Sequence, residues 1–157
     1  MELIAWIEET ALAEWVRASL IGYPMMITLH SVGLAVVVGL AVVIDLRVLG
    51  AFRGMPFSSL RTLFTIAWVG FLVNFLSGAA LFTSQSTVYV TDATFLIKMA
   101  FVAVGAATVG YLQPAIARIG DGLGADTAVP GSAKAAAIIS LAVWAGATIT
   151  GRLIAYL

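Results

Sequence analysis

The sequence predicts an all-α protein, a four-helix transmembrane bundle preceded by an N-terminal amphipathic interfacial helix. Of the 157 residues, 62% are hydrophobic and 10% are charged, whereas a soluble domain carries roughly 25% charged residues. Four apolar stretches can each cross a hydrocarbon layer of about 30 Å, which takes roughly 20 helical residues. They lack the two-residue alternation of barrel strands, and backbone groups in lipid need hydrogen-bond partners within their own segment, so we expect helices.

The chain is expected to form one membrane domain, residues 1–157, whose first element is an interfacial helix over residues 1–19. The apolar side of this helix would consist of Leu3, Ile4, Ile7, Ala11, Trp15 and Ala18. Trp6 and Trp15 suit the membrane interface, where their rings contact both lipid and water. A mobile tail is the alternative. The acidic start lacks the basic region of a cleavable signal, so no processing is expected.

Local signals mark where the spans begin and end. The spans are expected at about residues 24–50, 59–83, 93–119 and 133–157. Pro24 suits the first turn of a helix, where its missing N–H is not needed. Pro56 breaks the chain, and the serines that follow it, Ser58 and Ser59, offer caps to the second span. Asp92 is expected to cap the third. Residues 120–132 are rich in Gly, Asp and Pro and are expected to form the connection between the third and fourth spans.

The basic residues predict the orientation of the spans. Arg47, Arg53 and Arg61 lie in or near the first connection, and Arg118 and Lys134 flank the third, whereas the second connection has no basic residue. Since cytoplasmic loops are enriched in Lys and Arg, both termini are expected on the outer side. The net charge is zero and the chain has no cysteine. These facts exclude nucleic-acid binding, disulfides, thiolate metal sites and iron–sulfur clusters.

Polar side chains inside the spans gather at one depth. His30, Lys98 and Arg152 each lie about 7–9 Å from the outer end of their helix, at 1.5 Å per residue. Titratable groups inside a membrane are expensive, so each is a functional hypothesis. Lys98 and Arg152 are also close enough to the helix ends to reach outer headgroups as interfacial anchors. A lone histidine can equally be a ligand or a partner of a neighbouring helix.

The second span adds Asn74 and Ser77, whose spacing of three residues places them on one helix face. Gly33 lies close to His30 on the first span, and Gly70 and Gly78 form a seam of small residues on the second. Such a seam admits a neighbouring helix or a flat ligand. The candidate binding residues are therefore His30, Gly33, Asn74, Ser77, Lys98 and Arg152.

A separate group of charges lies at the cytoplasmic end of the first span. Asp45 and Arg47 are expected to pair with Arg61 or Arg118. Because these charges are close to water, the expected role is to fix the connection rather than to perform chemistry.

Several segments resemble an uncharacterised bacterial family of small four-helix integral membrane proteins. They are residues 30–35, His-Ser-Val-Gly-Leu-Ala; residues 45–50, Asp-Leu-Arg-Val-Leu-Gly; residues 95–98, Phe-Leu-Ile-Lys; and residues 151–156, Gly-Arg-Leu-Ile-Ala-Tyr. The resemblance implies that His30, Asp45, Arg47, Lys98 and Arg152 stand at motif positions, and it implies no established activity. More loosely, the chain is similar to b-type cytochromes and to the haem- and quinone-binding membrane-anchor subunits of respiratory complexes. Cytochromes of this type usually supply paired histidines, whereas this chain has one.

Haem b is the first cofactor expected at this site. His30 can be an axial ligand of the iron, and Lys98 or Arg152 can pair with the propionates. The sixth position would be taken by Met26, Met99 or Lys98, by His30 of a second chain, or left open. Quinone is the alternative, with His30, Asn74 and Ser77 bonded to its carbonyl oxygens. Both predict a role in membrane electron transfer.

Two other classes of function remain open. The polar groups can simply tie the helices together in a ligand-free accessory subunit of a membrane complex. An oligomeric transport or channel protein is also compatible with four short spans. The chain is expected in a bacterial cytoplasmic (inner) membrane, as a homodimer or with a partner membrane subunit.

Overall fold

A computed structural model describes residues 2–120 and 128–154 of the chain, and the described part is helical with no β-strand. The elements are α1 (Glu2–Glu8), α2 (Ala11–Ala18), α3 (Gly22–Val48), the 3₁₀ turn η1 (Phe57–Ser59), α4 (Leu60–Thr83), α5 (Ser86–Tyr89), α6 (Ala93–Gly120) and α7 (Gly131–Leu153). The predicted all-α class is confirmed. Parts of the expected last connection and of the fourth span, residues 121–127 and 155–157, lie outside the described residues.

In the part of the chain that the structure describes, four helices are long and apolar enough to cross a membrane. They lie within residues 22–48, 57–83, 93–119 and 131–153, close to the expected spans, and the mean hydropathy of their most apolar windows is 1.5 to 2.4. Between 17% and 28% of each window is buried inside the protein. Most of this apolar surface therefore faces outward, where lipid is the solvent that accommodates it.

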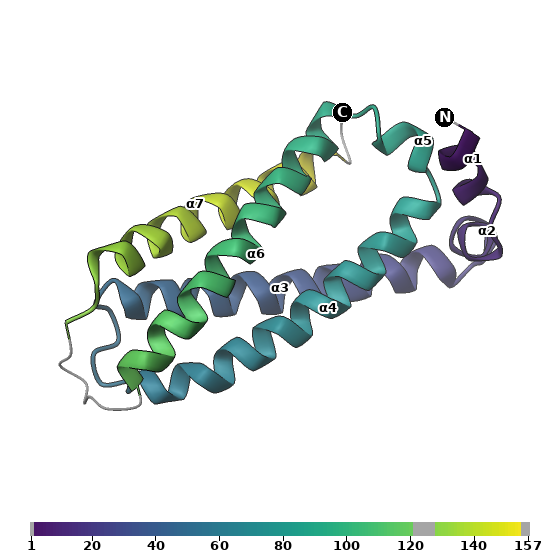
Figure 1. Cartoon of the computed structure of the whole chain (residues 1–157). Coiled ribbons are helices and arrows are strands. Elements are labelled where there is room, and N and C mark those ends of the chain that lie inside the picture. The colour runs from purple at the N-terminus through teal and green to yellow at the C-terminus, as the bar shows by residue number, and fades with distance from the viewer. Residues whose placement is uncertain (1, 121–127, 155–157) are drawn as a thin grey trace.

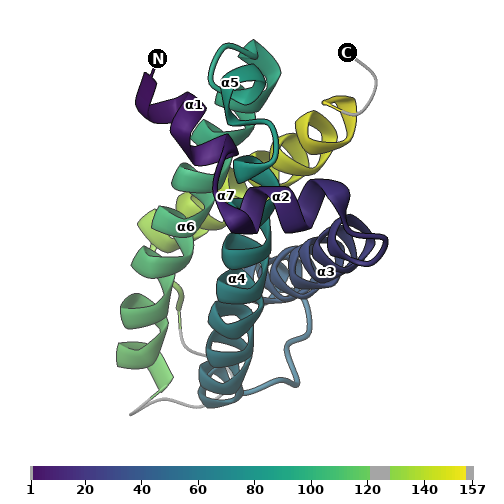
Figure 2. The ribbon, with the colours of Figure 1, turned by 90° about the vertical axis from the view of Figure 1, so that its right-hand side faces the viewer.

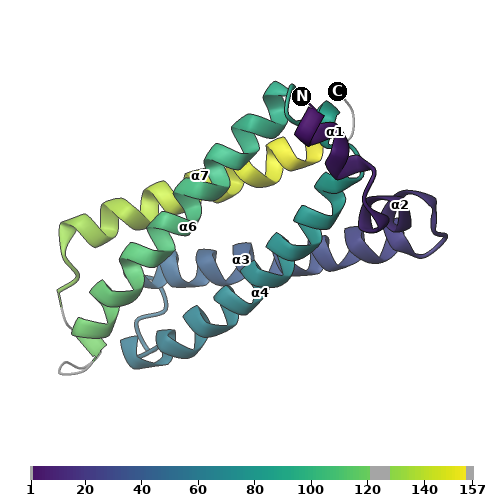
Figure 3. The ribbon, with the colours of Figure 1, turned by 45° about the vertical axis from the view of Figure 1, so that its right-hand side comes forward.

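The four long helices form two antiparallel pairs. Figure 1 shows α3 running beside α4, and α6 beside α7. α3 also packs against α7, whereas α4 and α6 touch little. The connection between α3 and α4 lies at one end of the bundle, here called the η1 end. α1, α2, α5 and the end of α7 lie at the other, here called the α5 end (Figures 1 and 3).

Glycines allow the helices of each pair to approach closely. A Cβ atom on Gly33 of α3 would lie 2.7 Å from the backbone nitrogen of Asn74 on α4. On α6 and α7, a Cβ on Gly105 would lie 2.8 Å from the ring of Trp144. Helices in lipid associate through close packing rather than through the hydrophobic effect, so such contacts stabilise the pairs.

The largest buried core is at the η1 end. It is formed by Ile44, Val48, Phe57, Leu60, Phe64, Val109, Leu112, Ile116, Ile119, Ala133 and Ala137. These residues come from α3, η1, α4, α6 and α7, so the long helices converge here. The second core cluster is small: Val37, Ala41, Trp144 and Ala147. The α5 end is consequently less tightly filled.

The N-terminal segment forms two helices rather than the single helix expected over residues 1–19. The side-chain oxygen of Thr10 accepts a hydrogen bond from the backbone N–H of Ala13 and begins α2. Because the helix is interrupted here, the residues of α2 do not continue the helical repeat of α1. Ala13 and Val16 are buried, whereas Ala11 and Ala18, which were expected on the apolar side, are exposed. α2 crosses the ends of α3 and α4 (Figure 2).

Glu8 and Arg17 attach this segment to the turn between α4 and α6. The Glu8 carboxylate accepts hydrogen bonds from the backbone N–H and the hydroxyl of Thr87, both at 2.7 Å. It thereby caps the single turn of α5. Arg17 donates to the backbone carbonyls of Ser84 and Glu8, both at 3.3 Å. The α5 end is therefore closed by polar contacts instead of an apolar core.

Of the two expected caps, one is confirmed. The backbone N–H of Phe95 donates to Asp92 Oδ1 at 2.8 Å, so Asp92 caps α6. The serine caps of the second span are wrong, since Ser59 makes no side-chain capping bond to α4. The chain instead enters α4 through η1, whose tight turn uses backbone hydrogen bonds.

Candidate functional site

A cavity of about 320 Å³ lies between α3, α4 and α6, toward the α5 end. Its polar lining comes from His30 on α3, Asn74 on α4 and Lys98 on α6. The other lining residues are Phe71, Phe75, Gly78, Ala79, Phe82, Phe95, Met99 and Val102. Three of the residues proposed from the sequence therefore meet at one cavity, each from a different helix.

His30 and Asn74 bind each other's backbone. The Nδ1 atom of His30 lies 2.9 Å from the backbone oxygen of Asn74, and the Asn74 side-chain amide donates to the backbone oxygen of His30 at 2.7 Å. A carbonyl oxygen only accepts, so Nδ1 carries the hydrogen. In the neutral ring, Nε2 then holds the free lone pair. The imidazole thus presents a hydrogen-bond acceptor or a metal ligand.

Gly78 makes room for the imidazole. A Cβ atom at this position would lie 2.9 Å from Cε1 and 3.1 Å from Nδ1 of His30. A side chain here would have to displace the ring. The glycine therefore leaves the space in which the ring lies against α4 and forms its hydrogen bond to Asn74.

Lys98 brings a cation to the same cavity. Its aliphatic chain packs along α7 at Gly151, where a Cβ atom would lie 3.4 Å from Lys98 Cε. The side chain is half-buried and lines the same cavity as His30. No carboxylate lines the cavity within the described chain. The cavity therefore combines one cationic donor with one imidazole acceptor.

The other three candidate residues lie outside this cavity. Gly33 packs against α4 at the helix crossing. Ser77 is buried, and its hydroxyl donates to the backbone oxygen of Val73, at 2.6 Å, within its own helix. Arg152 is exposed near the end of α7. Gly33 and Ser77 thus contribute to helix packing. Arg152 fits the alternative role predicted from the sequence, that of an interfacial anchor.

Aromatic residues that we did not single out from the sequence make up much of the lining. Phe71, Phe75 and Phe82 share a face of α4 with Asn74 and Gly78, through spacings of three and four residues. This spacing was the available signal. It was hidden because the whole helix is apolar and carries no amphipathic contrast.

An aromatic cluster closes the cavity at the α5 end. Phe82, Tyr89 and Phe95 stack on one another with ring centroids 5.2 to 6.3 Å apart. They come from α4, α5 and α6, which otherwise diverge here. Aromatic pairs of this kind are worth about 0.5–1.5 kcal/mol each beyond their burial.

The side of the cavity between α4 and α6 opens toward lipid. Phe75, Ala79 and Met99 line it and are exposed. They lie within segments apolar and long enough to span a membrane. An apolar ligand could therefore enter from the hydrocarbon layer without crossing water.

The charged residues at the η1 end take different partners from those expected. Asp45 is 1% exposed, next to Ser140 of α7, and its Oδ2 atom has no hydrogen-bond partner in the described chain. Arg47 donates from Nε to the Met55 backbone oxygen at 2.6 Å, and its Cζ lies 4.0 Å from the centroid of the Phe57 ring. Arg47 therefore does fix the connection between α3 and α4, through a hydrogen bond to the Met55 carbonyl and a contact with the Phe57 ring.

Within residues 2–120 and 128–154, no group of three or more His, Asp or Glu side chains could hold a metal ion. His30 is thus the one imidazole ligand that the chain offers. Comparisons with protein-family models, with curated proteins and with solved structures find no match for this chain.

Proposed function

We propose that the chain is a membrane protein that binds a quinone in electron transfer, with the headgroup in the cavity of His30, Asn74 and Lys98. The observation that carries the proposal is the fixed tautomer of His30, whose Nδ1 is held by the Asn74 carbonyl at 2.9 Å. This leaves an acceptor at Nε2 in a cavity that Lys98 also lines and whose other lining residues, apart from Asn74, are apolar. A quinol hydroxyl needs such an acceptor, and a quinone carbonyl needs such a donor.

The size and the lining suit one or two fused rings. Ligand cavities usually measure about 300–1,000 Å³, and this one is about 320 Å³. Phe71, Phe75 and Phe95 supply flat faces for an aromatic headgroup. The lipid-facing opening beside Phe75 and Met99 gives an isoprenoid tail a path into the hydrocarbon layer.

His30 and Lys98 would contact the two oxygens of the headgroup. Nε2 of His30 would accept the hydrogen bond of a quinol hydroxyl and is the base that could take up its proton. The Asn74 carbonyl would stabilise the protonated ring, because it accepts the hydrogen bond from Nδ1. Lys98 donates to the second oxygen and orients the ring. Asn74 acts through His30 as a positioning residue, because its own amide is bonded to the His30 backbone.

Haem b is the second candidate, favoured by one observation: Met99 lines the same cavity as His30. Nε2 of His30 and the thioether of Met99 are both known types of axial ligand. Lys98 would pair with a propionate. The small cavity volume ranks this candidate below quinone.

The test is cofactor content and binding in the detergent-purified protein. An organic extract is expected to contain quinone, and the absorption spectrum is expected to lack a Soret band, the signature of haem. H30L should weaken binding of a short-chain quinone about tenfold, the effect of losing one hydrogen bond of roughly 1.4 kcal/mol. K98M should do the same.

Ser31→Ala is the matched control for H30L. Ser31 is exposed and donates to Ile27 of its own helix, so its loss should leave binding unchanged. A folded protein that contains no quinone, binds none and shows no Soret band would contradict both cofactor proposals. The polar residues would then be interhelical ties of an accessory subunit, and H30L would lower only the thermal stability.

A further inference from the structure

The lining of the His30 cavity bears on the class of quinone that the proposed site would take. Of the side chains that line it in the described chain, only those of His30, Asn74 and Lys98 carry nitrogen or oxygen. The Asn74 amide nitrogen is bonded to the backbone oxygen of His30 at 2.7 Å. In the proposed function, His30 and Lys98 contact the two oxygens of the headgroup. The rest of the headgroup would therefore meet a mostly apolar surface.

Four phenylalanines make up much of that surface, and none of them is fully buried. Phe71, Phe82 and Phe95 are partly exposed, and Phe75 is exposed. Three of the four belong to α4 and Phe95 belongs to α6. A flat ring bound here would consequently find aromatic side chains on two helices.

Contacts among aromatic rings hold these side chains in place. Phe71 and Phe75 are stacked, with ring centroids 6.3 Å apart and planes at 20°. Phe82 and Phe95 are stacked at 5.7 Å and 21°. Tyr89 of α5 does not line the cavity, but its ring lies 5.2 Å from that of Phe95. Side chains that are already ordered lose less entropy when a ligand binds.

Quinone headgroups differ in how well they match such a surface. A naphthoquinone keeps one benzene ring in both its oxidised and its reduced form, and aromatic rings pair favourably. The oxidised ring of a benzoquinone is not aromatic. A dimethoxybenzoquinone would also bury two ether oxygens against apolar side chains, and a buried polar atom without a hydrogen bond costs free energy.

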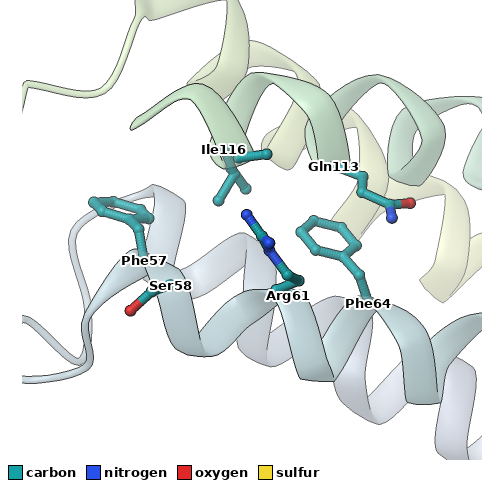
Figure 4. Close-up of a pocket in the computed structure, with 7 residues that line it drawn as sticks. Phe57, Ser58, Arg61, Phe64, Gln113 and Ile116 are labelled. Atoms are coloured by element: carbon teal, nitrogen blue, oxygen red, sulfur yellow. The ribbon is translucent and has the colours of Figure 1, made fainter. Parts of the chain in front are cut away.

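A smaller cavity, of about 180 Å³, lies at the η1 end and shares no lining residue with the His30 cavity (Figure 4). Phe57, Phe64 and Ile116 on its walls are only 1–3% exposed, so they offer little surface to a ring. Figure 4 shows Arg61 extending from α4 toward Ile116. A headgroup is therefore not expected there, and we expect one quinone per chain.

We propose that the headgroup bound beside His30 is a naphthoquinone, in preference to a benzoquinone. The inference rests on the proposed function of the cavity and adds the class of the ligand. His30 and Lys98 would bind the oxygens of the quinoid ring, and the fused benzene ring would contact the phenylalanines of α4 and α6.

Binding of three quinones to the detergent-purified, full-length protein tests the proposal. The probes carry the same short isoprenoid tail on a naphthoquinone, on a dimethoxybenzoquinone and on a methyl-substituted benzoquinone. Isothermal titration calorimetry gives the stoichiometry and the Kd of each. The naphthoquinone is expected to bind once per chain, with a Kd about tenfold below that of the dimethoxybenzoquinone, which corresponds to about 1.4 kcal/mol.

The methyl-substituted benzoquinone separates the effect of the fused ring from that of the methoxy groups. Its Kd is expected to lie between the other two. If either benzoquinone binds as tightly as the naphthoquinone, the proposed class is wrong, although the cavity remains a quinone site. If none of the three binds, the proposed function fails as well.

F75L and F95L each remove one ring from the lining and keep an apolar side chain. Each is expected to lower the preference for the naphthoquinone about threefold, the effect of losing one aromatic contact. Tyr111 of α6 is exposed and does not line the cavity, so Y111L is the matched control and should keep the full preference. A preference that persists in both F75L and F95L would reflect partition into the detergent and would overturn the proposal.

Discussion

At the residue scale, Asp45 and Ser140 form an incomplete pair between α3 and α7. Asp45 is 1% exposed and Ser140 is fully buried, and neither Asp45 Oδ2 nor Ser140 Oγ has a hydrogen-bond partner in the described chain. Buried polar atoms without partners destabilise the fold by about 1–3 kcal/mol each. This pair is thus a weak point in an otherwise apolar interface.

Asp45→Asn is expected to stabilise the protein by about 1 kcal/mol, because the new amide can donate a hydrogen bond to the Ser140 hydroxyl. The measurement is thermal or denaturant unfolding in detergent. In an S140A background the acceptor is gone, so the gain should disappear. An equal gain in both backgrounds would show that Ser140 is not the partner.

His30 shows how one contact can serve both packing and chemistry. The bonds between His30 and Asn74 join α3 to α4 and at the same time select the tautomer. Hydrogen bonds between membrane helices are worth about 0.6–2 kcal/mol. A loss of stability in a His30 variant therefore does not by itself distinguish a ligand site from a structural tie. Ligand binding must be measured separately.

At the scale of elements, the crossing of α3 and α4 depends on backbone contact at Gly33. G33A would place a Cβ 2.7 Å from the Asn74 nitrogen and 2.9 Å from the Gly70 oxygen. Neither atom can move without separating the helices. We expect G33A to lower Tm and to disturb the bond between His30 and Asn74.

Gly39 on the same helix is the matched control for G33A, because a Cβ there meets nothing within 4 Å. G39A should leave Tm unchanged or raise it slightly, since alanine favours helix by about 1 kcal/mol over glycine. If the two variants unfold alike, the crossing is looser than the structure indicates.

The attachment of α1 to α5 should depend on pH through Glu8. The backbone N–H of Thr87, and next its hydroxyl, hold the pKa of Glu8 below its ordinary value of 4.5. A lowered pKa means that the contact is favoured above about pH 4.5 and is lost as the pH falls through the lowered value. Hydrogen-exchange protection of residues 86–89 should therefore decrease in acid.

E8Q removes the ionised partner, so protection of α5 should be weaker at neutral pH and should no longer fall as the pH drops below 4.5. Glu9, its exposed neighbour, supplies the control: E9Q should keep the pH dependence of the native chain. If E8Q retains that dependence, another group is responsible for it.

At the scale of the whole molecule, the two ends are built differently. Apolar side chains from α3, η1, α4, α6 and α7 fill the η1 end. Polar contacts of Glu8 and Arg17 and the aromatic cluster of Phe82, Tyr89 and Phe95 close the α5 end. The 320 Å³ cavity lies on the less tightly packed side, where α4 and α6 are not in contact along most of their length.

Cysteine labelling can establish which end faces the cytoplasm, because the chain has no cysteine of its own. Gly54 at the η1 end and Gln85 at the α5 end are both exposed. With the basic η1 end inside, a membrane-impermeant maleimide should label Q85C in intact cells and G54C only after lysis. The reverse pattern would invert the bundle and place the His30 cavity on the cytoplasmic side.

The sequence by itself determined the all-α class, the four long apolar helices and the Asp92 cap. It also predicted one site for six residues; the structure brings His30, Asn74 and Lys98 to one cavity and leaves Gly33, Ser77 and Arg152 outside it. These follow from local properties: apolar length sets the spans, and the rise per residue sets the depth of each polar group. Residues at one depth on neighbouring helices can meet without any knowledge of the exact crossing.

Only the tertiary structure decided which way each helix faces. All four long helices are apolar all round, so periodicity does not indicate a buried side. Gly33 lets α3 lie in close contact with α4. In this arrangement His30 is hydrogen-bonded to Asn74 and Ser77 is buried. The aromatic lining and the attachment of α1 to α5 depend likewise on contacts between distant segments, which no local pattern encodes.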